Sequence, residues 1–271
     1  SFQGECGRLA GVKLSNGTEL PCELAVVAAG VQPNTALARA AGLAIGVTNG
    51  IIVDTHMRTS DHAIYAAGDC VEMRNRITGR PGHAPYGDLA NLQGRVAAQN
   101  ALLGDRDVFP GTIQTGICKI FEYAAGTTGL SERVARDAGL DCLTVINASP
   151  DKPGFMSGKM LITKLMAERS GGKILGAQCI GPGDVSMQIA IWATAILGEL
   201  CVEDMVNADL PYAPPFSLAI DHSIATAHLM QNKKTVGLGS LILTNRRLLF
   251  LHQVPPGPRV NESIRNLADA T

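Results

Sequence analysis

Four runs of strand-forming residues in the second half of the chain constrain its fold more than any other feature. The last two runs are separated by Ser170, Gly171 and Gly172, and glycine tolerates the positive φ angles of a tight hairpin turn. The spacing therefore predicts an antiparallel sheet in which these two strands are neighbours. The four runs cover residues 117–124, 143–148, 160–167 and 174–180.

Two helices are expected to interrupt this sheet. Residues 131–138 begin at Ser131, a capping-type residue, and stop at Gly139. Residues 184–200 carry one apolar stripe at helical spacing. Together with the strands they indicate an α+β domain over residues 114–232. The stripe consists of Ile189, Ala193, Ile196, Leu197 and Leu200.

The first half of the chain, residues 1–113, alternates shorter strand and helix signals and reads as α/β. An Asn-Gly turn at Asn16 separates a strand over residues 8–14 from a buried apolar strand over residues 24–29. Helices are expected over residues 35–41, capped by Thr35, and over residues 88–103. Short strands are expected over residues 50–54 and 63–67. The helical spacing of the second helix comes from Leu89, Leu92, Val96 and Leu103.

Charge, cysteine content and hydropathy exclude several classes of protein. The 23 basic residues nearly balance the 24 acidic ones, so no nucleic-acid partner is expected. The seven cysteines lack any paired spacing and the six histidines lack metal-ligand spacing, which indicates reduced thiols, a cytoplasmic location and no metal site. The most apolar stretch, residues 236–251, contains Arg246 and Arg247 and is too short to span a membrane. Residues 1–7 do not resemble a signal peptide.

A strand that runs into Gly68 and Asp69 is the first motif with possible chemistry. Glycine lets a ligand approach the backbone, and the Asp69 carboxylate can accept hydrogen bonds from hydroxyl groups. By itself the pair is an ordinary turn. However, residues 57–60 (MRTS) and 64–70 (IYAAGDC) resemble the second flavin motif of the pyridine nucleotide-disulfide oxidoreductases. The resemblance implies that Asp69 bonds the ribityl chain of FAD and that Gly68 lines the site.

Two further segments extend this resemblance. Residues 26–34 (VVAAGVQPN) look like the family's turn between its nicotinamide and flavin domains, which implies that Gly30 and Pro33 lie near cofactor. Residues 85–95 (PYGDLANLQGR) resemble the helix whose N-terminus faces the flavin pyrimidine, where free N–H groups stabilise negative charge. Asp88, Leu89 and Ala90 would lie there. Asp88 and Leu89 replace the usual Gly and Pro, so an extra carboxylate is expected to shift the flavin potential.

A proline-stiffened loop at residues 211–217 (PYAPPFS) is the most specific motif of the second half. Three prolines make a pre-shaped loop, whose Tyr212 and Phe216 could simply pack. The string resembles the interface domain of coenzyme A-disulfide reductases, persulfide reductases and related NADH oxidases. That resemblance implies that the loop crosses a homodimer, that Tyr212 serves as a proton donor or hydrogen-bonding residue at the partner's substrate site, and that Phe216 lines the pocket.

The resemblance covers residues 7–232 and implies an α/β flavin-domain portion followed by an α+β dimerisation domain with an antiparallel sheet. The chain holds no G-x-G-x-x-G turn, so it is expected to be the C-terminal portion of a longer enzyme and inactive alone. That enzyme would use FAD and NAD(P)H to reduce a disulfide or persulfide, possibly linked to coenzyme A. The alternatives are an NADH oxidase that reduces oxygen, or a non-enzymatic dimerisation module that lost the cofactor. Residues 233–271 form a tail of unclear fold.

Overall fold

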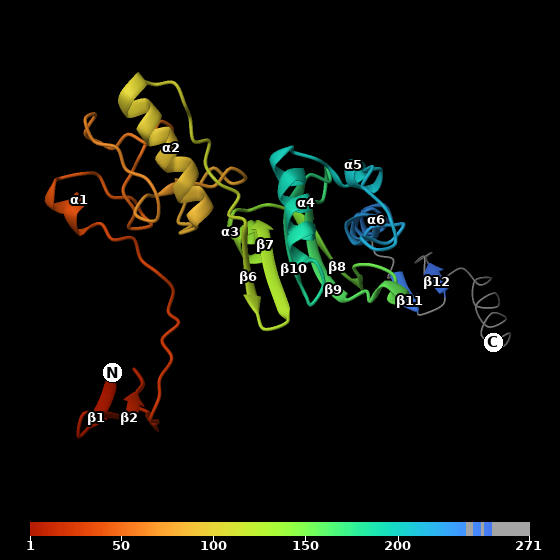
Figure 1. Cartoon of the computed structure of the whole chain (residues 1–271), viewed down its shortest axis with the longest axis horizontal. Coiled ribbons are helices and arrows are strands. Elements are labelled where there is room, and N and C mark those ends of the chain that lie inside the picture. Colours follow the sequence, from red (N-terminus) through yellow and green to blue (C-terminus); the bar gives the residue numbers. More distant parts are fainter. Residues whose placement is uncertain (237–240, 245–246, 251–271) are drawn as a thin grey trace.

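The computed structural model describes residues 1–236, 241–244 and 247–250, and Figure 1 shows the order of its elements along the chain. The first half contains β1 (Phe2–Glu5), β2 (Arg8–Lys13), β3 (Glu19–Pro21), α1 (Ala36–Ala40), β4 (Met73–Arg74), β5 (Pro81–Gly82) and α2 (Gly87–Leu103). The second half contains β6 (Gly116–Ile120), β7 (Tyr123–Gly129), α3 (Glu132–Asp137), β8 (Cys142–Pro150), a 3₁₀ turn (Gly154–Met156), β9 (Met160–Glu168), β10 (Ile174–Gly181), α4 (Val185–Leu197), α5 (Val202–Val206), α6 (His222–Val236), β11 (Leu241–Thr244) and β12 (Arg247–Phe250).

The N-terminal sheet corrects one prediction. β1, β2 and β3 form an antiparallel sheet in that order, and the strand that follows the Asn-Gly turn is β3, not residues 24–29. Residues 23–34 make no hydrogen bond within the part of the chain that the structure describes. Val26 is 85% exposed and Leu24 is 81% exposed. The apolar run was expected to be buried, but burial requires a neighbouring surface, and Figure 1 shows this segment as an extended connection to α1.

The rest of the first half packs around one small core. Met57, Val71 and Leu89 are buried there, and α2 supplies one wall. The strands expected over residues 50–54 and 63–67 do not form ladders: Ile51 makes isolated bridges and Tyr65 bridges only Arg58. Thr35 begins α1 as expected, although its side chain makes no capping hydrogen bond.

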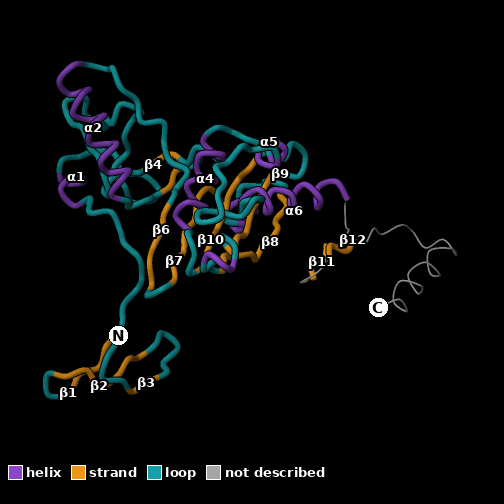
Figure 2. Tube along the Cα trace, turned by 45° about the vertical axis from the view of Figure 1, so that its right-hand side comes forward, coloured by secondary structure: helices purple, strands orange, loops and turns teal. Residues whose placement is uncertain are grey.

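The second half is built on a five-stranded antiparallel sheet with the order β6-β7-β10-β9-β8, as Figure 2 shows. β9 and β10 are neighbours joined by a short turn, so the predicted hairpin is confirmed. The run predicted as one strand over residues 117–124 is two strands, β6 and β7, because the chain reverses at Phe121, which has a φ of 52°.

Helices cover one face of this sheet. α4 packs on β7 and β10, while α6 packs on β8 and β9. Trp192 of α4, Leu165 of β9 and Met230 of α6 are fully buried in the shared core. The side chain of Ser131 caps α3 as the sequence predicted, and the side chain of Asp184 caps α4, which ends at Leu197, earlier than expected.

The opposite face of the sheet carries an exposed apolar row. Ile162 of β9 and Ile180 of β10 are paired directly across the two strands, and they are 45% and 48% exposed. Residues directly opposite one another in an antiparallel pair project from the same face. The row therefore runs through Ala148, Ile162, Ile180, Ala125 and Cys118, one residue from each strand.

The C-terminal part of the chain is described only in pieces. Sequence reasoning missed α5 and α6, and α6 runs through the boundary predicted near residue 232. β11 and β12 pair antiparallel with each other. Most of the tail predicted over residues 233–271 lies outside the described residues.

Candidate functional site

The turn at Gly68 and Asp69 lies against the start of α2. Gly68 has a φ of 88°, and a methyl group placed on its Cα would stand 3.5 Å from Cβ of Ala90. His83 Nε2 lies 2.8 Å from the carbonyl oxygen of Asp69. The Asp69 side chain is exposed, so its carboxylate is available to a hydroxyl-bearing ligand.

Gln93 joins this turn to α2. Its Oε1 accepts a 2.7 Å hydrogen bond from the backbone N–H of Gly68. The side chain is fully buried, yet its Nε2 has no hydrogen-bond partner within the described residues. Because buried polar groups are nearly always paired, this free donor is available to an acceptor oxygen from outside these residues.

The first turn of α2 offers more unpaired donors. Tyr86 begins the helix without a side-chain cap, and within the described residues the backbone N–H groups of Gly87, Asp88 and Leu89 make no hydrogen bond. A helix start of this kind attracts negative charge. The glycine turn, the buried free amide and the open helix start fit a flavin whose polar oxygens and reduced ring need donors.

The structure says less about Gly30 and Pro33, the other predicted cofactor residues. Gly30 has a φ of 83° and no atom within 4 Å of the position that a side chain would take. Pro33 is buried, but no hydrogen bond ties its segment to the Gly68 turn within the described residues. The structure thus brings Gly68 and Ala90 into one cluster and leaves Gly30 apart from any neighbour.

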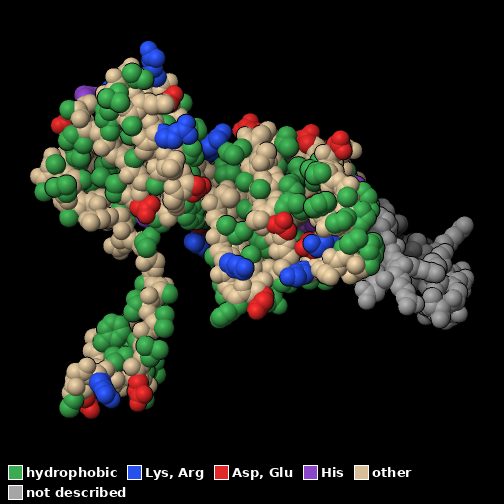
Figure 3. Space-filling model, in the orientation of Figure 1, with side chains coloured by type: hydrophobic (Ala, Val, Ile, Leu, Met, Phe, Trp, Pro, Cys, Tyr) green, Lys and Arg blue, Asp and Glu red, His purple; other side chains and the backbone are tan. Residues whose placement is uncertain are grey.

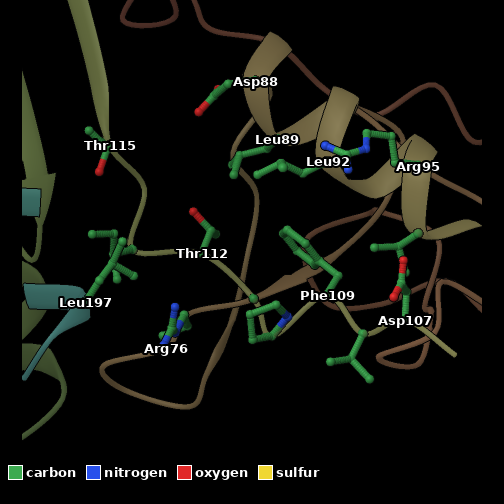
Figure 4. A pocket seen from close by; sticks show the side chains of 15 residues that line it. Arg76, Asp88, Leu89, Leu92, Arg95, Asp107, Phe109, Thr112, Thr115 and Leu197 are labelled. Carbon is green, nitrogen blue, oxygen red and sulfur yellow. The ribbon is translucent and has the colours of Figure 1, made fainter. Parts of the chain in front are cut away.

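A pocket of about 350 Å³ opens between α2, residues 107–115 and the end of α4, as Figure 4 shows. Leu89 and Phe109 supply apolar walls, and Asp88 lies at one side. Gly68 and Asp69 do not line it. The pocket therefore lies on a different face of α2 from the flavin-like turn and was not anticipated from the sequence.

The proline loop is closed by its own hydrogen bonds. The carbonyl oxygen of Ala213 accepts from the backbone N–H groups of Phe216 and Ser217, at 2.9 and 3.1 Å. The Ser217 hydroxyl donates to the carbonyl oxygen of Pro211 at 3.2 Å. Tyr212 is 54% exposed and Phe216 is 75% exposed. The loop is thus internally fixed while its two aromatic residues face outward.

Buried polar groups anchor the end of this loop to the sheet. The Asp221 carboxylate accepts from the hydroxyl and backbone N–H of Ser223. His222 is fully buried, with Nδ1 2.7 Å from the Ser149 hydroxyl and Nε2 2.8 Å from that of Thr163. Burial lowers the pKa of His222, against the opposing effects of Asp221 and Asp151. The neutral ring is a hydrogen-bonded structural histidine.

The remaining features concern disulfides, metal ligands and membrane-spanning helices among the described residues. All seven cysteines are free, and burial raises the pKa of the Cys179 thiol, which keeps it protonated. Among the described residues, no three His, Cys, Asp or Glu side chains gather as metal ligands. None of the described helices combines the length and apolarity needed to cross a membrane.

Comparison with known proteins identifies the family. A model described as pyridine nucleotide-disulphide oxidoreductase matches residues 1–88, and the model for the dimerisation domain of the same family matches residues 115–224. The chain belongs to the pyridine nucleotide-disulphide oxidoreductases. FAD and NAD(P)H are the cofactors of this oxidoreductase family, and the chain carries its dimerisation domain. The two matched ranges fall on either side of residue 113, while the domain limits themselves stay a prediction.

Individual relatives within the family act on sulfur compounds or are named oxidases. An NAD(P)H sulfur oxidoreductase (CoA-dependent) of Pyrococcus furiosus is 32% identical over 80% of this chain and 49% of its own length. An NADH oxidase of Methanocaldococcus jannaschii is 33% identical over 72% of this chain and 43% of its own length. The structure of an NAD-dependent persulfide reductase from A. fulgidus shares 42% identity and a TM-score of 0.81, covering 86% of this chain and 43% of that one. The chain therefore spans about half the length of these family members.

Proposed function

We propose that the enzyme containing this chain is an FAD-dependent NAD(P)H oxidoreductase that reduces a disulfide or persulfide, such as coenzyme A disulfide. The observation that carries the proposal is the Gly68–Asp69 turn held beside the uncapped start of α2. The sulfur-reducing relatives support the substrate class. For a disulfide, NAD(P)H and one proton yield two thiols and NAD(P)⁺.

The residues of the first half would bind and orient the flavin. Asp69 accepts hydrogen bonds from the ribityl hydroxyls, and Gly68 leaves room for that chain. The open N–H groups of Gly87, Asp88 and Leu89, next to Ala90 at the start of α2, would donate to the pyrimidine oxygens. Gly30 and Pro33 complete the cofactor-binding set in our proposal. When bound, the flavin would supply the hydride and electron transfer.

The second half would complete the site of a second copy. In Figure 1 the loop between α5 and α6 lies at the far end of the β6–β10 sheet from α2, and Figure 2 agrees. The loop that carries Tyr212 and Phe216 therefore lies apart from α2 of its own chain. We place them at the partner's substrate site, where the Tyr212 hydroxyl donates a proton or hydrogen bond and Phe216 lines the pocket.

A homodimer follows from this placement. The apolar row through Ile162 and Ile180 gives a second copy a surface to cover, and the dimerisation domain supports the same assembly. Acidic and basic side chains interleave on the face drawn in Figure 3, which offers no basic stripe for nucleic acid. Seven free cysteines suit the reducing cytoplasm, where we place the enzyme.

Flavin content is the first test. The purified full-length enzyme is expected to be yellow and to release FAD on denaturation, in about one equivalent per subunit. A colourless protein that cannot be reconstituted with FAD would contradict the proposal and favour a non-enzymatic dimerisation module.

Tyr212→Phe tests the substrate site. General acid catalysis contributes roughly 100-fold or more, so disulfide turnover is expected to fall by about that factor while flavin reduction by NAD(P)H keeps its rate. Tyr123→Phe is the matched control, because Tyr123 is also 54% exposed but lies on β7. Equal turnover of both variants would remove Tyr212 from the mechanism.

The second candidate is an NADH oxidase, favoured by the 33% identical relative of that name. The two functions differ in the electron acceptor. Oxygen consumption that matches NADH oxidation without any added disulfide or persulfide would support the oxidase. Slow oxygen consumption with rapid disulfide reduction would support the reductase.

A further inference from the structure

Gln93 is a buried polar residue on the face of α2 that packs against the Gly68 turn. It is fully buried, and the two polar atoms of its side chain have different surroundings. Oε1 accepts the backbone N–H of Gly68 at 2.7 Å, whereas Nε2 has no partner among the described residues. A helix that only needed to fill this space would carry an apolar residue there.

The orientation of this amide is fixed by its partner. The backbone N–H of Gly68 can only donate, so the oxygen of Gln93 must face it; the reversed amide would set two donors against each other. Nε2 is bonded to the same carbon as Oε1 and therefore lies beside the turn as well. A buried donor without an acceptor costs free energy, which indicates that this position serves the site rather than the helix alone.

The hydrogen bond acts on the peptide that sets the direction of Asp69. Gly68 holds a φ of 88°, and it lies close enough to Ala90 that the turn rests on the first turns of α2. The Gln93 contact restrains the Gly68 N–H, and the next residue, Asp69, is exposed with its carboxylate outward. Loss of the contact would free the turn to move while the Asp69 carboxylate itself is kept.

We propose that Gln93 is a positioning residue of the flavin site, which holds the Gly68–Asp69 turn in the orientation that binds the ribityl chain. This inference rests on the proposed flavin function. It assigns to Gln93 an effect on FAD affinity that acts through Gly68, and no direct part in the transfer of electrons.

The test is FAD binding to the full-length enzyme that contains this chain. Gln93→Met keeps the length of the side chain and removes both polar atoms. Apoprotein titrated with FAD, followed by quenching of flavin fluorescence, is expected to bind about tenfold more weakly than the parent, because Gly68 loses its acceptor. Gln93→Glu keeps an oxygen toward Gly68 and lacks the amide N–H, so tighter binding by Gln93→Glu than by Gln93→Met is expected and would assign the loss to the Gly68 contact.

Gln188→Met is the matched control. Gln188 of α4 is also fully buried, donates one hydrogen bond to Asp221 and leaves its Oε1 without a partner among the described residues. Its replacement is expected to lower thermal stability while FAD affinity stays within about twofold of the parent. Equal weakening by Gln188→Met and Gln93→Met would reduce Gln93 to a general packing role and overturn the inference.

The outcomes separate this inference from the proposed function. A parent enzyme that binds no FAD contradicts the function itself. A parent that binds FAD and a Gln93→Met variant with the same affinity contradict only the role of Gln93. If Gln93→Met does not fold, Gln93→Asn replaces it, because the amide stays polar but is one methylene too short to reach Gly68; unchanged FAD affinity of that variant would equally overturn the inference.

Discussion

The two halves of the chain differ in how completely they bury their own apolar residues. In the second half, five hydrogen-bonded strands and two covering helices bury Trp192 and Leu165 completely. In the first half, residues 23–34 form no hydrogen bond within the described part of the chain, and Val26 is 85% exposed. The second half therefore has a core of its own beneath one exposed sheet face, whereas Leu24 and Val26 of the first half have no neighbouring surface among the described residues to cover their side chains.

This difference also separates the two candidate sites. The Gly68 turn has beside it a buried donor, Nε2 of Gln93, that is unpaired among the described residues, so it is suited to receive a ligand. The proline loop is internally satisfied and projects Tyr212 and Phe216 outward, so it is suited to complete a site elsewhere. The first half would bind a ligand, and the second half would contribute Tyr212 and Phe216 to the site of a partner. A homodimer with shared sites requires this arrangement.

The largest expected effect comes from the core of the second half. Trp192→Ala removes a fully buried ring and is expected to lower the free energy of unfolding by about 3–5 kcal/mol. Val26→Ala, at an exposed position, is expected to change it by less than about 0.5 kcal/mol. Urea unfolding of both variants of the 271-residue chain measures the contrast. Similar losses in the two variants would show that residues 23–34 are as buried as α4.

The open face of the sheet gives the next largest effect. Ile180→Lys places a charge in the centre of the apolar row and is expected to weaken dimerisation at least about tenfold, since a buried unpaired charge is costly. Sedimentation equilibrium measures the dimer constant. Glu122→Lys, in the exposed turn between β6 and β7, introduces the same side chain outside the row. An unchanged dimer in Ile180→Lys would exclude this face as the interface.

The sequence predicted the second half better than the first for a physical reason. The strand-forming runs of β9 and β10 are close together in the sequence and are separated by a glycine turn, so their pairing could be predicted from neighbouring residues. The β6–β7 turn escaped prediction because Phe121 and Glu122 are not typical turn residues. α6 was not predicted because two of its buried residues at helical spacing, Ser223 and Thr226, are polar. They interrupt the helical spacing of apolar residues on which the prediction relied.

The first half shows what a sequence pattern does not contain. The apolar content of residues 24–29 predicts burial, yet burial depends on a neighbouring surface that the segment cannot encode. The glycine and aspartate of the flavin motif were visible as a string, while the contact from Gln93 was not. Its one signal was a polar residue four positions after Leu89, on the buried stripe of α2. Leu92 and Leu103, which supplied the predicted spacing, are exposed.

A smaller effect concerns the pH dependence of the second half. Burial lowers the pKa of His222, so the unfolded chain takes up a proton near pH 6.5 while the folded chain still does not. The unfolded state then binds more protons, and stability falls as the pH drops below about 6.5, by at most about 1.4 kcal/mol per pH unit for one group.

His222→Gln removes this ionisation and is expected to flatten the loss of stability between about pH 6.5 and pH 5. Thermal unfolding across that range measures it. His228→Gln, at an exposed position of the same helix, controls for the exchange of residue type. A steeper loss in His222→Gln than in the parent would contradict the assigned direction of the pKa shift.

The smallest effect is expected at the start of α2, in the first half of the chain, which would bind the ligand. Asp88 adds a carboxylate where the open N–H groups would otherwise favour a reduced, negatively charged flavin. Asp88→Gly is expected to raise the flavin potential by about 5–20 mV, since an exposed charge contributes about 0.2–1 kcal/mol and 30 mV corresponds to about 1.4 kcal/mol for two electrons. Asp88→Asn removes the charge without the backbone freedom of glycine, so equal shifts in both variants would assign the effect to charge. Potentials identical to that of the parent, measured by dye equilibration, would show that Asp88, which lies at one side of the pocket beside residues 107–115, does not act on the flavin.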